Sequence, residues 1–148
     1  MEIEKILGSK FKDNRQKAII NLRITSNHIG HIYNSYMAKH DLSMAQFNIL
    51  RILRGAKETI SVNTVKERMV ERSPNTTRLM DKLIEKKLIE RIRCDEDRRV
   101  VYVTIAESGL ELLSKIDEEF DFNFHFHENI TDEEAIMLSN LLDKLRGD

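Results

Sequence analysis

Histidine and cysteine supply the side chains of this sequence that could bind a metal or react with an oxidant. His28 and His31 lie three residues apart, and His125 and His127 lie two apart, so each pair offers two nitrogen ligands. A structural zinc takes four ligands, and ordinary polar roles are therefore the simpler interpretation of both pairs. Cys94 is the single cysteine, and it could act as a redox sensor if basic neighbours favour its thiolate. We assign no metal ligand from the sequence.

Catalytic machinery is not evident. A nucleophile, a base and a group that orients the base cannot be assembled from these residues, and the sequence has no glycine-rich phosphate loop. We therefore expect neither an enzymatic activity nor a cofactor.

A short amphipathic segment near the middle of the chain carries polar side chains suited to DNA. Ser73 is predicted to cap a helix whose first residue is Pro74, because proline lacks an amide that this position leaves unused. One side of this helix is apolar and the other polar, which an ordinary surface helix would also show. Short hydroxyl and amide groups followed by arginine can reach base edges and phosphates in a major groove. The residues predicted to contact DNA are Ser73, Asn75, Thr76, Thr77, Arg78 and Lys82.

A charged tip between two alternating segments is the second candidate for DNA contact. Residues 89–93 and 101–105 alternate between apolar and polar, which predicts the two strands of a β-hairpin. The tip contains Asp97, Arg98 and Arg99. Arginines at such a tip can enter a narrow minor groove, and the Asp97 carboxylate can orient a guanidinium by a bidentate bond. A solvated charged turn is the plain alternative.

The segments before this helix and hairpin are predicted to be helical. A long helix over 13–39 carries apolar residues at heptad spacing. Ser43 and Gln46 form a capping box that opens the next helix, for which Gly55 is the predicted end. A third helix over 61–69, followed by a turn at 70–72, makes a helix-turn-helix with the helix of Pro74, although helical hairpins in general share this description.

The C-terminal third is also predicted to be helical. Ser108 and Gly109 lead into one helical segment, and Thr131 with Glu134 forms a second capping box that opens the last helix. The phenylalanines between 120 and 126 alternate with polar residues, which is a strand period. We predict helix there because no turn residue precedes the run.

The composition of the 148-residue chain favours a helix-rich cytoplasmic protein. Charged residues make up 33% of it and hydrophobic residues 41%, with 5 glycines and 1 proline. Residues 1–99 carry 21 basic and 13 acidic groups, whereas residues 100–148 carry 3 and 12, an asymmetry that a DNA-facing surface would produce. The single cysteine, the lack of a secretory signal and the lack of a membrane-spanning stretch suit the cytoplasm and no membrane partner.

Several motifs in this order resemble the MarR family of winged helix-turn-helix transcriptional regulators. They are Thr-Arg-Leu-Met-Asp-Lys-Leu at 77–83, Leu-Ile-Glu-Arg at 88–91, Asp-Arg-Arg at 97–99 and the closing Gly109. Two positions depart from the family pattern. Lys87 replaces a glycine after the recognition helix, so we expect a left-handed lysine or a different helix end. Ala106 replaces a capping threonine, which would leave Ser108 or solvent to cap the next helix.

The resemblance implies a mainly α fold with a small β-hairpin wing, in a single MarR-like domain over 1–148. Residues 43–106 would form the winged helix-turn-helix lobe, and helices within 13–39 and 110–146 would form the dimerisation region. The expected partner is pseudo-palindromic operator DNA bound by a homodimer that acts as a repressor. Arg99 would enter the minor groove and Arg98 would contact phosphate.

The resemblance also implies a small lipophilic or phenolic effector, bound where the dimerisation helices meet the DNA lobe. The residues predicted to contact it are Tyr33, Tyr36, Met37, Phe47 and Arg51. A metal-responsive or redox-responsive regulator of the same fold, and a winged-helix module that binds another protein, are the alternatives.

Overall fold

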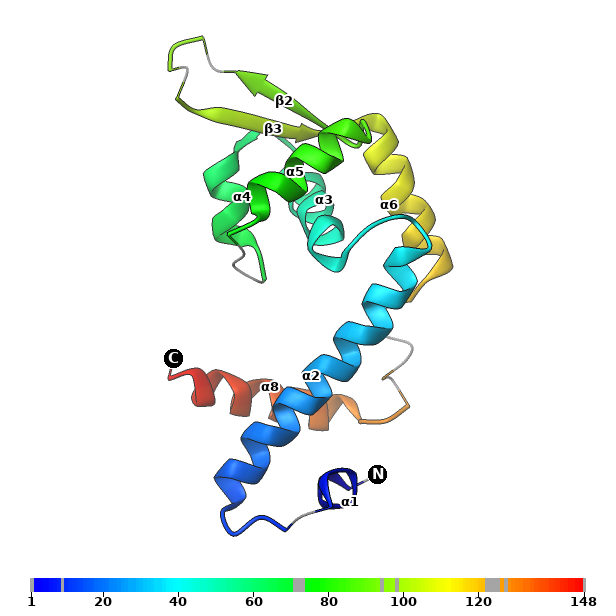
Figure 1. Ribbon diagram of the computed structural model, residues 1–148, viewed down its shortest axis with the longest axis vertical. Helices are drawn as coiled ribbons and strands as arrows, with labels where there is room; N and C mark the ends of the chain where they lie inside the picture. Colours follow the sequence, from blue (N-terminus) through cyan, green and yellow to red (C-terminus); the bar gives the residue numbers. More distant parts are fainter. Residues whose placement is uncertain are drawn as a thin grey trace. The chain divides into compact units, whose positions relative to one another are not determined.

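Helices and one small antiparallel sheet make up the computed structural model (Figure 1). It describes residues 2–8, 10–70, 74–93, 95–97, 99–121, 126 and 128–147. Two compact units, Met1–Leu110 and Glu111–Asp148, divide the chain within α6, and each is described by itself. The elements are α1 (Ile3–Leu7), α2 (Asn14–Ala38), α3 (Met44–Ala56), β1 (Ile60–Ser61), α4 (Val62–Arg68), α5 (Thr76–Glu85), β2 (Ile89–Arg93), β3 (Val101–Ile105), α6 (Glu107–Glu119) and α8 (Asp132–Arg146).

The long helix α2 confirms the helix predicted over 13–39 and ends in a tight turn. Leu42 N donates to Met37 O at 3.1 Å and Asp41 N donates to Ala38 O at 3.1 Å, with Asp41 in the left-handed conformation at φ 55°. These two bonds form a Schellman motif, which satisfies carbonyls that the helix end leaves unpaired. The chain then turns directly into α3.

Helix α3 begins as predicted and ends later. The Ser43 hydroxyl accepts from Gln46 N at 3.1 Å, and Ser43 N donates to the Gln46 side chain at 3.0 Å, which confirms the capping box. Gly55 was the predicted end, but it lies inside the helix, which continues to Ala56. The left-handed residue that ends the helix is Lys57, at φ 55°, so no glycine is used for this purpose.

The helix-turn-helix consists of α4 and α5, and its second helix starts later than predicted. Ser61 caps α4 by accepting from Thr64 N at 3.0 Å. Helix α5 begins at Thr76 rather than Pro74, because Pro74 and Asn75 form a turn and Asn75 has a non-helical ψ of 6°. Ser73, predicted to cap this helix, lies outside the described residues, as do 71 and 72.

The predicted hairpin is confirmed and gains a third strand. Strands β2 and β3 pair antiparallel with Ile89 opposite Ile105 and Arg93 opposite Val101. β1 pairs with the other edge of β3, which gives the order β1-β3-β2. β1 has only two residues, so its sequence contains no alternation from which a strand could have been predicted.

The core of the first unit lies where α3 meets α4, α5 and the sheet. The side chains that are at most 2% exposed there are Phe47, Ile49, Leu50 and Leu53 of α3, Val65 of α4, Met80 and Leu83 of α5, Ile89 of β2 and Val103 of β3. Burial of one such aliphatic or aromatic side chain stabilises the fold by about 2 kcal/mol. The lobe is therefore built around α3.

The C-terminal helices confirm one local prediction and correct two. Thr131 and Glu134 form the predicted capping box at the start of α8. The Ser108 hydroxyl, an expected cap of α6, instead donates to the main-chain oxygen of Lys87 at 2.6 Å. Helix α6 ends at Glu119, so Phe120 is outside it, and residues 122–125 and 127 of the phenylalanine run lie outside the described residues. In the part of the chain that is described, no helix is both long enough and apolar enough to cross a membrane.

At Gly109 the helix α6 passes close to Leu88 and to Ile105 of β3, and replacement of this glycine should destabilise the lobe. A Cβ at this position would lie 2.3 Å from the Leu88 carbonyl oxygen and 2.8 Å from a side-chain carbon of Ile105. We expect Gly109→Ala to lower the free energy of unfolding in urea by about 1–3 kcal/mol, as for other overpacked sites. Gly55→Ala is the matched control, because no atom lies within 4 Å of the added carbon and alanine favours a helix. Equal stability of the two variants would contradict this view of the contact.

Candidate nucleic-acid interface

Helix α5 has the two faces that its sequence predicts, with one exception. Met80 and Leu83 are at most 1% exposed and pack in the core. Thr77, Arg78, Asp81 and Lys82 are exposed on the opposite side. Thr76, predicted to contact DNA, is only 1% exposed, because it lies one turn before Met80 on the buried face. The structure therefore removes Thr76 from the exposed surface. Asn75, at the start of the helix, is exposed.

The end of α5 is formed without the glycine that the family pattern has there. Lys87 is left-handed at φ 59°, which is one of the two outcomes expected from the sequence. Leu88 N donates to Leu83 O at 3.0 Å and Lys87 N donates to Ile84 O at 2.9 Å, a Schellman motif like that of α2. The left-handed conformation costs a non-glycine residue about 1 kcal/mol. The hydrogen bond from Ser108 to the Lys87 carbonyl helps to hold it.

An ion pair joins the exposed face of α5 to the hairpin. The Arg91 guanidinium of β2 bonds the Asp81 carboxylate, with the two side chains 39% and 50% exposed. Arg91 lies two residues after Ile89 in β2 and therefore shares the side of the strand that carries the buried Ile89. The carboxylate of Asp81 is thus paired with Arg91 within the lobe. The side chains of Arg78 and Lys82 beside it are exposed at the surface.

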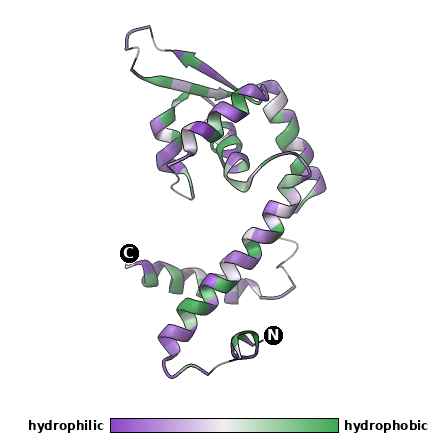
Figure 2. Cartoon of the chain, viewed as in Figure 1, coloured by the Kyte–Doolittle hydropathy of each residue, from purple (hydrophilic) through white to green (hydrophobic). Residues whose placement is uncertain are grey.

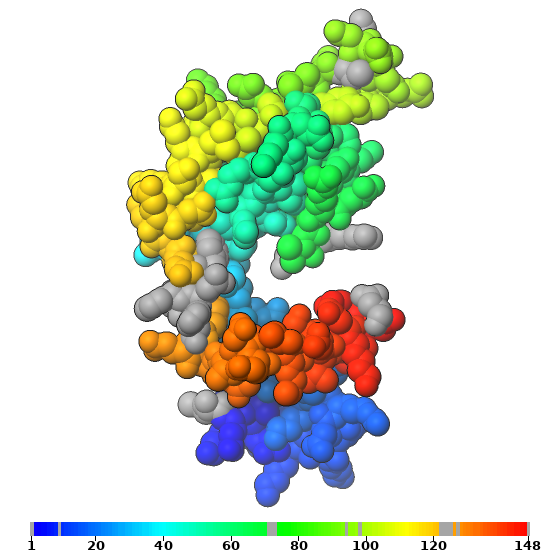
Figure 3. All heavy atoms as spheres, turned by 180° about the vertical axis from the view of Figure 1, so that it is seen from behind, coloured from blue at the N-terminus to red at the C-terminus, as the bar shows by residue number. Residues whose placement is uncertain are grey.

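The tip of the wing is ordered around Asp97. Its carboxylate accepts from Arg99 N at 3.0 Å, and its carbonyl accepts from Val100 N at 3.0 Å. The Arg99 Nε lies 3.5 Å from the same carboxylate oxygen, a single contact where a bidentate one was predicted. The Arg99 side chain is 94% exposed on a hairpin that projects from the lobe (Figure 3). Arg98 lies outside the described residues.

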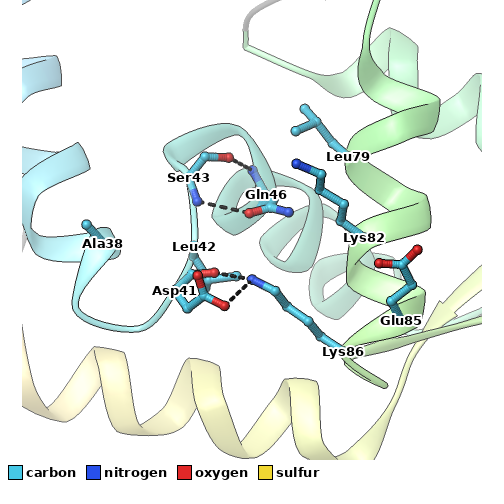
Figure 4. A pocket seen from close by; sticks show the side chains of 9 residues that line it. All are labelled: Ala38, Asp41, Leu42, Ser43, Gln46, Leu79, Lys82, Glu85 and Lys86. Carbon is cyan, nitrogen blue, oxygen red and sulfur yellow. Dashed lines mark hydrogen bonds and ion pairs between the residues drawn. The ribbon is translucent and has the colours of Figure 1, made fainter.

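A pocket of about 460 Å³ borders the C-terminal half of α5 (Figure 4). Its lining comes from the end of α2, the turn into α3 and α5: Ala38, Asp41, Leu42, Ser43, Gln46, Leu79, Lys82, Glu85 and Lys86. Lys86 pairs with Asp41 across it, whereas no hydrogen bond or ion pair of the Lys82 ammonium occurs among the described residues. The lining of the pocket thus includes apolar side chains, Ala38, Leu42 and Leu79, together with charged ones.

The residues predicted to bind an effector do not form this pocket. Met37 is 0% exposed and Phe47 is 1% exposed, so both belong to the core. Tyr33 and Tyr36 are both half-buried, and burial raises the pKa of the Tyr33 hydroxyl above its usual value. Arg51 is exposed, with its guanidinium 5.8 Å from the centre of the Phe47 ring. None of these five residues is in the lining described above.

The candidate metal and redox residues do not form a metal-binding cluster among the residues that the structure describes. His28 and His31 are exposed on α2, and within the described ranges no three His, Cys, Asp or Glu side chains are grouped to hold a metal ion. Cys94, His125 and His127 lie outside those ranges.

Three features of this surface were not predicted from the sequence. The pair between Asp81 and Arg91 could have been suspected, because Arg91 lies two residues after the buried Ile89 and so shares its face of the strand. The pair between Lys86 and Asp41 joins residues 45 positions apart, and no sequence pattern indicates it. The pocket depends on the same long-range contact.

A helix-turn-helix followed by an antiparallel hairpin defines the first unit as a winged helix-turn-helix domain. A model of the family described as transcriptional regulator SarA/Rot matches residues 31–116. The regulator YpoP of Bacillus subtilis, an uncharacterized HTH-type transcriptional regulator, is 34% identical over 71% of this chain and 74% of its own length. The chain therefore belongs to the MarR family of winged helix-turn-helix transcriptional regulators, within which it matches the SarA/Rot model.

Two further comparisons agree with this family. The HTH-type transcriptional regulator SarZ of Staphylococcus haemolyticus is 27% identical over 82% of this chain and 87% of its own length. A mutant of the Escherichia coli protein MarR, solved in complex with operator DNA, superposes with a TM-score of 0.77 over 90% of this chain and 99% of that chain. At 24% identity this last similarity shows the fold alone.

Proposed function

We propose that this protein is a transcriptional repressor that binds pseudo-palindromic operator DNA as a homodimer. In this proposal the exposed face of α5 enters the major groove and Arg99 enters the adjacent minor groove. Asn75, Thr77 and Arg78 would read the bases, and Lys82 would contact phosphate. Ser73 and Arg98, which lie outside the described residues, stay in the proposal from the sequence alone. A repressor has to reach the chromosome, so we place it in the cytoplasm.

The observation that carries the proposal is the set of contacts that joins α5 to β2 of the wing. The pair between Asp81 and Arg91 and the core contact of Met80 and Leu83 hold the helix against β2. A helix seated in a major groove and a hairpin tip in the next minor groove must keep a fixed separation, and these contacts supply one. The MarR mutant of similar fold was solved with operator DNA, which supports the same use of the fold here.

The homodimer is supported by an apolar stripe on α8. Met137, Leu141 and Leu145 follow one another at four-residue intervals and are 63%, 57% and 52% exposed. Figure 2 shows hydrophobic stretches recurring along α8 between hydrophilic ones. Large apolar side chains aligned on one helix face indicate an interface, because water contact with them is unfavourable. Pairing of two copies through such helices would present two α5 helices to sites about 34 Å apart on DNA.

Release by a small lipophilic or phenolic effector is the second part of the proposal. The pocket beside α5 supports it, since a ligand there would contact Leu79 and Lys82 of the helix itself. The tyrosines of α2 remain the alternative location. A ligand that prefers one orientation of the lobe would shift the population away from the form that fits DNA.

Replacement of Arg99 tests the DNA contact. We expect Arg99→Ala to weaken binding to the best duplex selected from a random library by roughly tenfold per subunit, and to lower the slope of log affinity against log salt by about one. Arg15→Ala, which removes the same charge from the distant start of α2, is the control and should change both quantities less. Measurement is by fluorescence anisotropy. Unchanged affinity in Arg99→Ala would favour a winged helix that binds protein instead.

Replacement of Leu141 tests the dimer. We expect Leu141→Glu to convert a dimer to a monomer in sedimentation velocity, because a charge would be buried in the interface. DNA affinity should then fall by on the order of a hundredfold, since each lobe would bind alone. Ser139→Glu, on another side of α8, should leave the dimer intact. A wild-type protein that sediments as a monomer would contradict the proposal.

The effector is tested by adding phenols and benzoates to the protein–DNA complex. We expect at least one of them to raise the dissociation constant of the complex roughly tenfold or more, a coupling of typical size for an allosteric ligand. Ala38→Trp, which would fill the pocket, should abolish the effect if the ligand binds there, and Tyr36→Ala should abolish it if the ligand binds on α2. A response that survives both changes excludes both locations.

A further inference from the structure

One ammonium group joins the end of α5 to the end of α2. The Nζ of Lys86 lies 2.9 Å from the carboxylate Oδ2 of Asp41 and also donates to the main-chain oxygen of Asp41 (Figure 4). Lys86 is the C-cap residue of α5, and its side chain is 31% exposed. None of the residues proposed to read bases lines the pocket in which this contact lies, so base recognition as described above does not use it.

Both helix ends have the same structure and the same electrostatic need. Asp41 after α2 and Lys87 after α5 are left-handed, and each is followed by the long hydrogen bond of a Schellman motif. The C-terminus of a helix carries a partial negative charge, which a nearby cation stabilises. Helix α2 has no basic residue in its last turn, and Asp41 adds a further negative charge there. Lys39 is the C-cap residue of α2, and Lys86 adds from α5 a second cation, which is bonded directly to Asp41.

Two ion pairs thus hold α5, and they act on different sides of it. Asp81 bonds Arg91 of β2, and Lys86 bonds Asp41 of the turn between α2 and α3. Residues five positions apart on a helix point about 140° from each other. Rotation of α5 about its own axis would therefore stretch at least one of the pairs, and the same rotation would move Thr77 and Arg78 relative to the wing.

We infer that Lys86 is a positioning residue for DNA binding, which acts through Asp41 to set the rotation of α5. The inference rests on the proposed function. Lys82 offers a direct comparison, because it lies one turn earlier on the wall of the same pocket and its ammonium has no bond in the described parts of the chain. Lys82 is available to a phosphate, whereas the charge of Lys86 is already used by Asp41.

The test compares Asp41→Asn, Lys86→Ala, the double variant and the charge exchange Lys86→Asp with Asp41→Lys. Asparagine tolerates the left-handed conformation, and this chain already holds lysine in it at 57 and 87. We expect each single change to weaken binding to the selected duplex roughly three- to tenfold, the double change to add nothing, and the exchange to recover most of the loss. Removal of the Asp41 charge would by electrostatics alone strengthen DNA binding, so the expected sign is diagnostic.

Two further measurements separate positioning from a direct charge effect. The salt dependence of affinity should stay at the wild-type slope in Asp41→Asn and Lys86→Ala, and it should fall in Lys82→Ala, whose loss should add to that of Asp41→Asn. In the free protein, residual dipolar couplings should show a changed orientation of α5 relative to α3 in Asp41→Asn but not in Lys82→Ala.

Wild-type binding to the selected duplex decides the proposed function by itself, and the variants then decide the role of Lys86. Loss of affinity in Lys86→Ala together with unchanged or tighter binding in Asp41→Asn would overturn the inference and make Lys86 a phosphate contact. An unchanged orientation of α5 in the free Asp41→Asn variant would also overturn it. Urea unfolding of each variant confirms that the folded protein is being compared.

Discussion

Burial of Met80 and Leu83 beneath α5 is the constraint on which the rest of the lobe depends. These side chains are at most 1% exposed, and together with Phe47 and Val103 they place α5 against α3 and the sheet. A helix of ten residues with its inner face held in this way must present the opposite face to solvent. Arg78 and Lys82 therefore lie at the surface because their neighbours are apolar, and no separate interaction is needed to expose them.

A second constraint acts where α5, β2 and α6 meet. The Leu88 carbonyl accepts from Ala106 N at 3.0 Å, and Gly109 passes so close to the same oxygen that a side chain would not fit. The Lys87 carbonyl next to it accepts from Ser108. The end of α5, the start of β2 and the start of α6 are thus fixed at one corner, so the direction of the hairpin follows from the direction of the helix before it.

Sequence reasoning succeeded where the determining interactions are local. The capping boxes at Ser43 and Thr131 depend on residues three positions apart, and the strands 89–93 and 101–105 depend on alternation within five residues. The polar face of α5 followed from helical periodicity alone. Thr76 was assigned to the DNA contact wrongly because it carries a short hydroxyl near the helix start, although it lies one turn before the buried Met80.

The features that were missed depend on contacts between distant parts of the chain. Strand β1 is defined only by its pairing with β3, which lies far along the sequence. The predicted end of α3 at Gly55 was wrong because a lysine takes the left-handed conformation two residues beyond it. The effector residues were inferred from resemblance, and the pocket beside α5 is lined in part by Asp41 and Lys86, whose contact no local pattern encodes.

Three helices of the first unit, α2, α3 and α5, are each followed by a charged residue in the left-handed conformation, namely Asp41, Lys57 and Lys87. Glycine adopts this conformation with less strain. Glycine would relieve the backbone but would also remove a side chain from the end of the helix. At Asp41 that side chain is in use, since it holds the ammonium of another helix. A glycine introduced at position 41 to relieve backbone strain would therefore remove this ion pair and weaken the contact that orients α5.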